Sequence, residues 1–137
     1  MADNTQLSVQ EYINLNYLHP NDMPLFNEAK GLADHLACYI GKYINVFEPK
    51  RRPLSLTALG LCDHKKKIIS IMFREKHRAC DGGGWKNEDV YIQSKKQVFK
   101  TVAHEVAHLM HNNHSKEFRS LEKELIEIVM SNYMEAK

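Results

Sequence analysis

This chain of 137 residues has only three cysteines, no long apolar run and almost no excess of charge of one sign. Cys38, Cys62 and Cys80 form no Cys-x-x-Cys pair, which argues against a disulfide framework or a cysteine zinc site and favours a reducing compartment. No apolar run reaches the roughly 20 residues of a membrane span, and the first residues lack the basic and apolar regions of a signal peptide. We therefore expect an intracellular protein, in the cytoplasm or nucleus, with no membrane partner.

Linkers rich in glycine, proline or serine are absent as well, as are internal repeats and low-complexity tracts. Because 43% of the residues are hydrophobic and 26% are charged, the composition is that of a globular protein able to bury a core. We expect one domain over residues 1–137, with residues 1–20 as an N-terminal extension. The 19 basic residues nearly balance the 17 acidic ones, so the net charge of +2 identifies no partner.

An amphipathic helix is expected over residues 22–40, where apolar side chains recur at three- and four-residue spacing. Asp22 is placed to cap its start, Pro24 suits the first turn and Gly41 can end it. Short apolar or β-branched runs at 43–47, 54–61 and 67–73 then predict strands.

The polar stretch 74–90 is interpreted as a loop. A second helix is expected from a cap at Ser94 to a stop at 112–113, and a third from a cap at Ser115. The order of helix, small three- to four-stranded sheet, helix and C-terminal helix predicts an α+β domain.

Half of the eight histidines fall between positions 104 and 114. On a helix, His104 and His108 lie one turn apart on the same face and can hold one Zn²⁺. Glu105 can reach a metal-bound water, whose pKa zinc lowers toward about 7, and can take its proton during attack on a carbonyl. We therefore expect a zinc site with Glu105 as the catalytic residue.

The third protein ligand has several candidates. His114 follows the expected turn at 112–113, where the chain can fold back toward the metal. His111 shares the helix face, but three ligands in line on a straight helix span too far for bonds of about 2.1 Å. A carboxylate of the next helix is the other alternative. The acidic candidates there are Glu122, Glu124 and Glu127.

Residues 104–118 resemble the WLM family of metallopeptidases, whose motif has HELxH, a histidine three residues later, a third ligand six after the second and then a phenylalanine. Residues 58–64 and 67–74 are similar to that family's stretch beginning LGLN. The resemblance covers about residues 22–130, and SprT-type, Spartan-type and YgjP-like proteins share the same compact zincin layout.

The resemblance implies a zincin-like domain in which His104, His108 and His114 hold zinc and Glu105 is the general base. It also implies a role in clearing proteins crosslinked to DNA, or in acting on ubiquitin-like conjugates. Residues 112–113 are Asn-Asn where the family often has Gly-Pro, and Cys62 replaces the usual Asn. This sequence does not include the tail that eukaryotic members use to bind ubiquitin-like proteins, so we expect the metallopeptidase chemistry to apply to this chain more closely than binding of that partner.

Positive charge is concentrated in residues 50–78, which contain nine basic and two acidic residues. A basic stretch near the catalytic helix suits contact with DNA phosphates, although a solvated rim that protects a strand edge has the same composition. The candidate nucleic-acid-binding residues are Arg51, Arg52, Lys65, Lys66, Lys67, Arg74 and Arg78.

Residues 67–73 are the candidate edge strand for an extended protein substrate, and an ordinary core strand is the alternative. Together these features predict a zinc-dependent endopeptidase that cleaves proteins associated with or crosslinked to DNA. Two alternatives stay open. One is a metal-stabilised nucleic-acid-binding module without catalysis, and the other is a YgjP-like zincin with no link to DNA.

Overall fold

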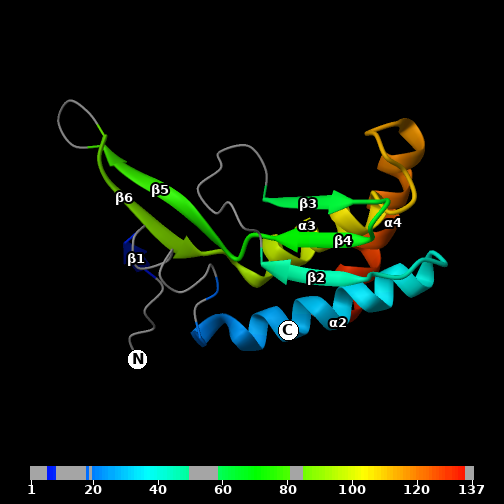
Figure 1. The fold of residues 1–137 in the computed structure, drawn as a ribbon, viewed down its shortest axis with the longest axis horizontal. Coiled ribbons are helices and arrows are strands. Elements are labelled where there is room, and N and C mark those ends of the chain that lie inside the picture. Colours follow the sequence, from blue (N-terminus) through cyan, green and yellow to red (C-terminus); the bar gives the residue numbers. More distant parts are fainter. Residues whose placement is uncertain (1–5, 9–17, 19, 50–58, 81–84, 135–137) are drawn as a thin grey trace.

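The computed structural model describes residues 6–8, 18, 20–49, 59–80 and 85–134, of which 6–8, 75–80 and 85–92 are described by their backbone. Figure 1 shows the arrangement of the elements, which make an α+β fold as expected. In chain order they are β1 (Gln6–Ser8), the 3-10 turn η1 (Pro20–Asp22), α2 (Met23–Tyr39), β2 (Val46–Pro49), β3 (Gly60–Asp63), β4 (Ile68–Ile71), β5 (Arg74–Cys80), β6 (Trp85–Ile92), α3 (Lys95–Ala107) and α4 (Lys116–Asn132).

Two three-stranded sheets replace the single small sheet that the sequence predicts. In the first, β4 lies between β2, to which it is parallel, and β3, to which it is antiparallel. In the second, β6 lies between β1 and β5. The prediction of a loop over 74–90 is therefore wrong, because β5 and β6 pair there as an antiparallel hairpin.

This hairpin extends away from the helices (Figure 1). Its backbone ladder supplies the hydrogen bonds that define the strands, and such a ladder does not require the alternating apolar pattern of a half-buried sheet. The polar sequence of residues 74–80 therefore gave no strand signal.

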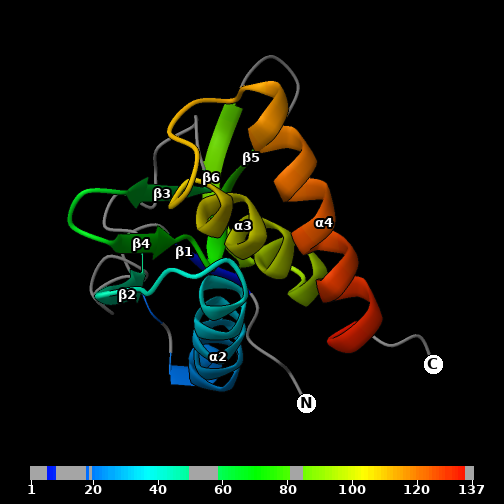
Figure 2. The same ribbon diagram turned by 90° about the vertical axis from the view of Figure 1, so that its right-hand side faces the viewer.

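Helix α3 is the centre of the fold, with α2 on one side, α4 on another and the sheet β2-β4-β3 on a third (Figure 2). Ile69 and Ile71 of β4 point inward and are fully buried, as are Val102 and Val106 of α3. Burial of such aliphatic side chains is the main stabilising contribution to a domain of this size. The packing fixes α3 against β3, and this contact forms the site described below.

Strand β4 occupies the middle of its sheet, so the prediction that residues 67–73 form an edge strand is wrong. Both of its edges are hydrogen-bonded, to β2 and to β3. Sequence periodicity indicates which face of a strand is buried, but it does not give the order of strands in a sheet. Among the described residues, β3 is the strand of this sheet that borders α3 and has an unpaired edge.

Helix α2 has the expected boundaries, with Asp22 at its N-cap position, proline in the first turn and Gly41 at φ 75° after its end. The Asp22 carboxylate, however, makes no capping hydrogen bond. It accepts instead from Arg74, with Nε 2.8 Å from Oδ2 and Nη2 3.1 Å from Oδ1, and both side chains are 1% exposed. This buried pair ties the start of β5 to the start of α2.

No helix in the described part of the chain is long and apolar enough to cross a membrane.

Candidate metal centre

The first two histidines of the cluster lie at the end of α3. The Ser94 hydroxyl caps this helix by accepting from the Gln97 backbone N–H at 3.0 Å, which confirms the predicted start. The helix ends at Ala107 with His108 as its C-cap, several residues before the predicted stop at 112–113. His104 therefore lies on the last turn, and His108 lies where the chain leaves the helix.

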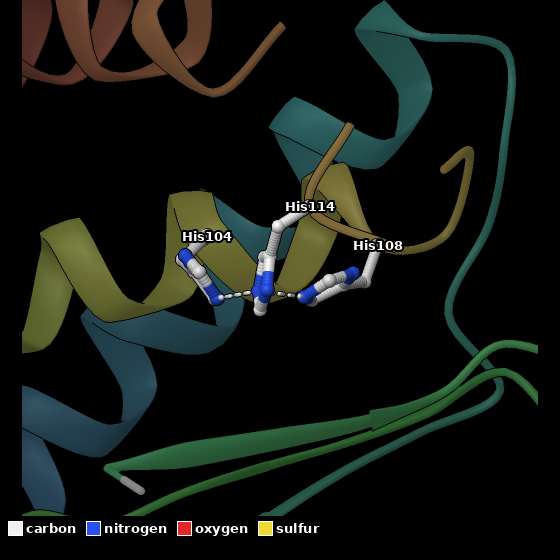
Figure 3. Close-up of side chains that lie close together, drawn as sticks. All are labelled: His104, His108 and His114. Atoms are coloured by element: carbon white, nitrogen blue, oxygen red, sulfur yellow. Dashed lines mark hydrogen bonds between the residues drawn. The ribbon is translucent and has the colours of Figure 1, made fainter. Parts of the chain in front are cut away.

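The early end of α3 lets the chain turn back over the cluster. Residues 108–110 form turns, and α4 begins after Ser115, whose hydroxyl accepts from the Phe118 N–H at 3.2 Å as predicted. His114, the residue before this cap, is thereby brought over the other two histidines (Figure 3). The structure thus selects His114 from the alternatives for the third member of the cluster.

The three Nε2 atoms of the cluster converge. That of His114 lies 3.2 Å from Nε2 of His108 and 3.4 Å from Nε2 of His104 (Figure 3). Bonds of about 2.1 Å at tetrahedral angles separate two ligand nitrogens by roughly 3.4 Å. The spacing of the imidazoles therefore fits one small tetrahedral metal ion, and among the described residues these three form the group that could hold it.

Hydrogen bonds on the far side of two rings fix their tautomers. The Nδ1–H of His104 donates to Glu122 Oε2 at 2.7 Å, and that of His108 donates to the His111 carbonyl at 2.9 Å. With the proton on Nδ1, each Nε2 presents a lone pair to the centre of the cluster. These two lone pairs, with Nε2 of His114 within 3.4 Å of both atoms, form a donor set that a single cation satisfies.

The other ligand candidates take different positions. Glu122 orients His104 from α4, and His111 orients His108 through its backbone carbonyl. Glu124 bonds to the Tyr39 hydroxyl, and Glu127 is exposed on α4. None of the four belongs to the cluster of converging donor atoms.

Phe118 forms the apolar base beneath the histidines. Its ring is 1% exposed, stacks on His108 with centroids 4.4 Å apart, and contacts His104 and His114 with centroids 5.0 Å away. Burial is the main cause that lowers the pKa of His108 below its usual value. The neutral form, which is the one that binds metals, is therefore favoured.

Glu105 leaves α3 on the side that faces β3 and is 5% exposed. A Cβ added at Gly60 would lie 2.9 Å from Cγ and Oε2 of Glu105 and 2.9 Å from Cγ2 of Thr101. Glycine at position 60 therefore gives the carboxylate its space against the strand. Gly60 belongs to no motif that the sequence reveals, although a glycine inside a strand often marks such a close approach.

A cleft of about 660 Å³ joins these groups. Its walls are β3 on one side and α4 with the 112–114 segment on the other, and α3 forms its floor. Cys62 of β3 borders it, and burial, with the Glu105 charge as the second cause, raises the pKa of this thiol to about 12. The lining residues are Leu59, Gly60, Leu61, Cys62, Gln97, Lys100, Thr101, His104, Glu105, His108, Asn112, His114, Glu122 and Ile126.

The predicted basic residues whose side chains the structure describes do not form one surface. Arg74 is buried against Asp22, so its assignment to nucleic-acid contact is wrong. Lys67 is half-buried, with Nζ 3.3 Å from the His64 carbonyl and 5.7 Å from the centre of the Tyr43 ring.

Lys65 and Lys66 are exposed in the β3–β4 turn, where their backbone N–H groups donate to Asp63. Arg51 and Arg52 lie outside the described residues, and Arg78 is described by its backbone in β5. Two exposed cations therefore remain on the part of this stretch whose side chains are described.

Comparison of the chain with protein-family models, with curated proteins and with solved structures found no match.

Proposed function

We propose that this protein is a zinc-dependent endopeptidase with a zincin-like domain, acting in the cytoplasm or nucleus. One observation carries the proposal. Three imidazole nitrogens lie within 4.8 Å of one another in a cleft, two of their spacings match those of tetrahedral zinc ligands, and the carboxylate of Glu105, next in sequence to His104, borders the same cleft. Three protein ligands with room for water or substrate are typical of catalytic rather than structural zinc sites.

The donor set favours zinc among the common metals. Neutral imidazoles suit Zn²⁺, whereas Mg²⁺ and Ca²⁺ prefer oxygen ligands. Bound zinc would supply a Lewis acid that activates water at neutral pH and polarises the substrate carbonyl. The His104–Glu122 hydrogen bond would keep the first ligand oriented and raise its basicity.

Glu105 is the proposed general base. Its carboxylate would take a proton from the attacking water and pass it to the leaving amine. Among the described residues the outer edge of β3 pairs with no other strand, and this edge, rather than residues 67–73, would hold the substrate as an added strand. An extended or locally unfolded segment of a protein is the substrate that such an edge accepts.

The variant Glu105→Gln tests the mechanism. We expect cleavage of unfolded casein to fall by about 10²- to 10⁴-fold because the proton acceptor is lost. Zinc content, measured by mass spectrometry, stays at the wild-type level because the ligands remain. Glu127→Gln makes the same chemical change on an exposed residue outside the cleft and serves as the control. Undiminished cleavage by Glu105→Gln would overturn the mechanism, whereas no cleavage by the zinc-loaded wild-type protein would leave a metal-stabilised binding module as the better account.

The resemblance to WLM and Spartan-type proteases extends the proposal to DNA-associated or DNA-crosslinked substrates. Exposed Lys65 and Lys66 at one end of β3 support this extension. We expect single-stranded DNA to accelerate cleavage of a DNA-binding protein, and Lys65→Glu/Lys66→Glu to reduce that acceleration without changing cleavage of casein. Equal rates with and without DNA would favour a zincin with no link to DNA.

A further inference from the structure

The end of the cleft that precedes His104 along α3 contains a lysine. Lys100, His104 and His108 are spaced four residues apart, so they form one row along the helix. Lys100 is exposed and lines the cleft, whereas the two histidines are half-buried. A cation therefore lies one helical turn from the first metal ligand, on the same face.

The surroundings of Lys100 leave its charge available to a ligand. Among the residues that the structure describes, it forms no ion pair, whereas Lys95 on the same helix pairs with Glu28 at 2.8 Å. Glu122, the acid of the facing wall, is hydrogen-bonded to His104. Leu59 and Ile126 line the cleft as well, and both are apolar. Such a site suits Asp or Glu, because the carboxylate can pair with the Lys100 ammonium group while the methylene groups contact the aliphatic wall.

The direction of β3 determines which part of a substrate would reach Lys100. Strand β3 and helix α3 run in the same sense in both views (Figures 1 and 2), and Gly60 lies beside Thr101 and Glu105. Antiparallel pairing is the more stable arrangement at a strand edge. A peptide added antiparallel to β3 therefore runs from the His108 end of the cleft toward the Lys100 end.

Residues after the scissile bond would then extend toward Lys100. Four helical residues rise about 6 Å, which equals about two residues of an extended chain. We propose that Lys100 is a specificity-determining residue that selects Asp or Glu at the first or second position after the scissile bond. This inference rests on the proposed endopeptidase function and names the substrate class of the same site.

Cleavage-site profiling tests the inference. Zinc-loaded wild-type protein is incubated with a peptide library, and the cut sites are read by mass spectrometry. We expect a preference for acidic residues at these positions on the order of threefold to fivefold, as for a partly exposed ion pair, weakening with added salt. Lys100→Glu should reverse the preference toward Lys and Arg. Lys123→Glu makes the same charge change on an exposed residue outside the cleft and should keep the wild-type profile.

A binding measurement separates failure of this inference from failure of the proposed function. Two labelled extended peptides, alike except for an adjacent Glu-Glu or Lys-Lys pair, are titrated with the zinc-loaded protein and followed by fluorescence anisotropy. If no peptide is cut, the endopeptidase proposal fails. Tighter binding of the Glu-Glu peptide, reversed in Lys100→Glu, would still support the role of Lys100. Equal binding of both peptides, or a cleavage profile that Lys100→Glu leaves unchanged, overturns it.

Discussion

The two walls of the cleft contribute different things to the site. The helical side of the cleft, which comprises the α3 floor, the 108–114 segment and α4 and is called the helical wall here, carries polar groups that are held by specific hydrogen bonds. The strand wall, β3, has an edge that pairs with no strand of the described part of the chain, and it carries a glycine where a side chain would collide with Glu105. The helical wall therefore contributes functional groups, whereas the strand wall contributes the space that the Glu105 side chain occupies. Mutations on the helical wall should therefore change metal binding, whereas mutations on the strand wall should change the position of the Glu105 carboxylate.

Glu122 tests the helical wall and should give the largest effect. Its hydrogen bond orients His104, whereas His108 is oriented by a backbone carbonyl that mutation of a side chain does not remove. We expect Glu122→Ala to weaken zinc affinity by roughly 10- to 100-fold, measured by competition with a chromogenic chelator. Glu127→Ala, five residues later on the same helix and exposed, should leave the affinity unchanged. An unchanged affinity in Glu122→Ala would mean that the Nδ1 hydrogen bond does not organise the site.

Gly60 tests the strand wall. An alanine methyl group would lie 2.9 Å from Cγ and Oε2 of Glu105, so the carboxylate or the strand has to move. We expect Gly60→Ala to reduce proteolysis by about tenfold or more, since small misplacements of a catalytic group are costly, while zinc affinity is retained. Overpacking should also lower the free energy of unfolding by about 1–3 kcal/mol.

The matched control for Gly60→Ala is Gly31→Ala. Gly31 lies within α2, and a Cβ added there meets nothing within 4 Å. Alanine at this position should raise the free energy of unfolding by roughly 0.5–1 kcal/mol because it lowers the entropy of the unfolded chain. Thermal denaturation followed by circular dichroism measures both variants. An increase in the free energy of unfolding in both variants would contradict the collision at position 60, whereas loss of zinc in Gly60→Ala would show that the two walls are not independent.

The same comparison explains what could be predicted from the sequence. The helical wall is local in sequence: the spacing of His104 and His108 and the caps at Ser94 and Ser115 act over three or four residues, and the structure places these residues as expected. The strand wall depends on contacts between distant segments. Gly60 meets Glu105 across 45 positions, and no periodicity in either segment encodes that contact.

Long-range pairing also explains the errors. The sequence around Asp22 predicts a helix cap, and that around Arg74 predicts a basic surface. In the structure the two side chains instead form a buried ion pair across 52 positions. Pairing of β5 with β6 likewise satisfies the backbone of a stretch whose side chains are mostly polar. The early end of α3 was missed because Asn112–Asn113 is a good stop signal, whereas the helix ends at Ala107 and the turns at 108–110 bring the segment that carries His114 over the cluster.

The pKa of Cys62 on the strand wall depends on the charge of Glu105 on the helical wall, and mutation of Glu105 should change it by the smallest of the expected effects. Burial raises the pKa of this thiol from 9.0 to about 12, and the Glu105 carboxylate contributes in the same direction. Since a raised pKa keeps the thiol neutral, the metal-free variant Cys38→Ser/Cys80→Ser should react slowly with iodoacetamide up to about pH 10. Glu105→Gln in that background should lower the pKa of Cys62 and shift the reaction to lower pH. The folded protein retains a proton that the unfolded chain loses above pH 9, so the free energy of unfolding should also fall as the pH rises beyond that point. A reaction profile that Glu105→Gln does not shift would mean that the charge of Glu105 does not contribute to the raised pKa of Cys62. Glu105 on the helical wall would then have no electrostatic effect on this thiol of the strand wall.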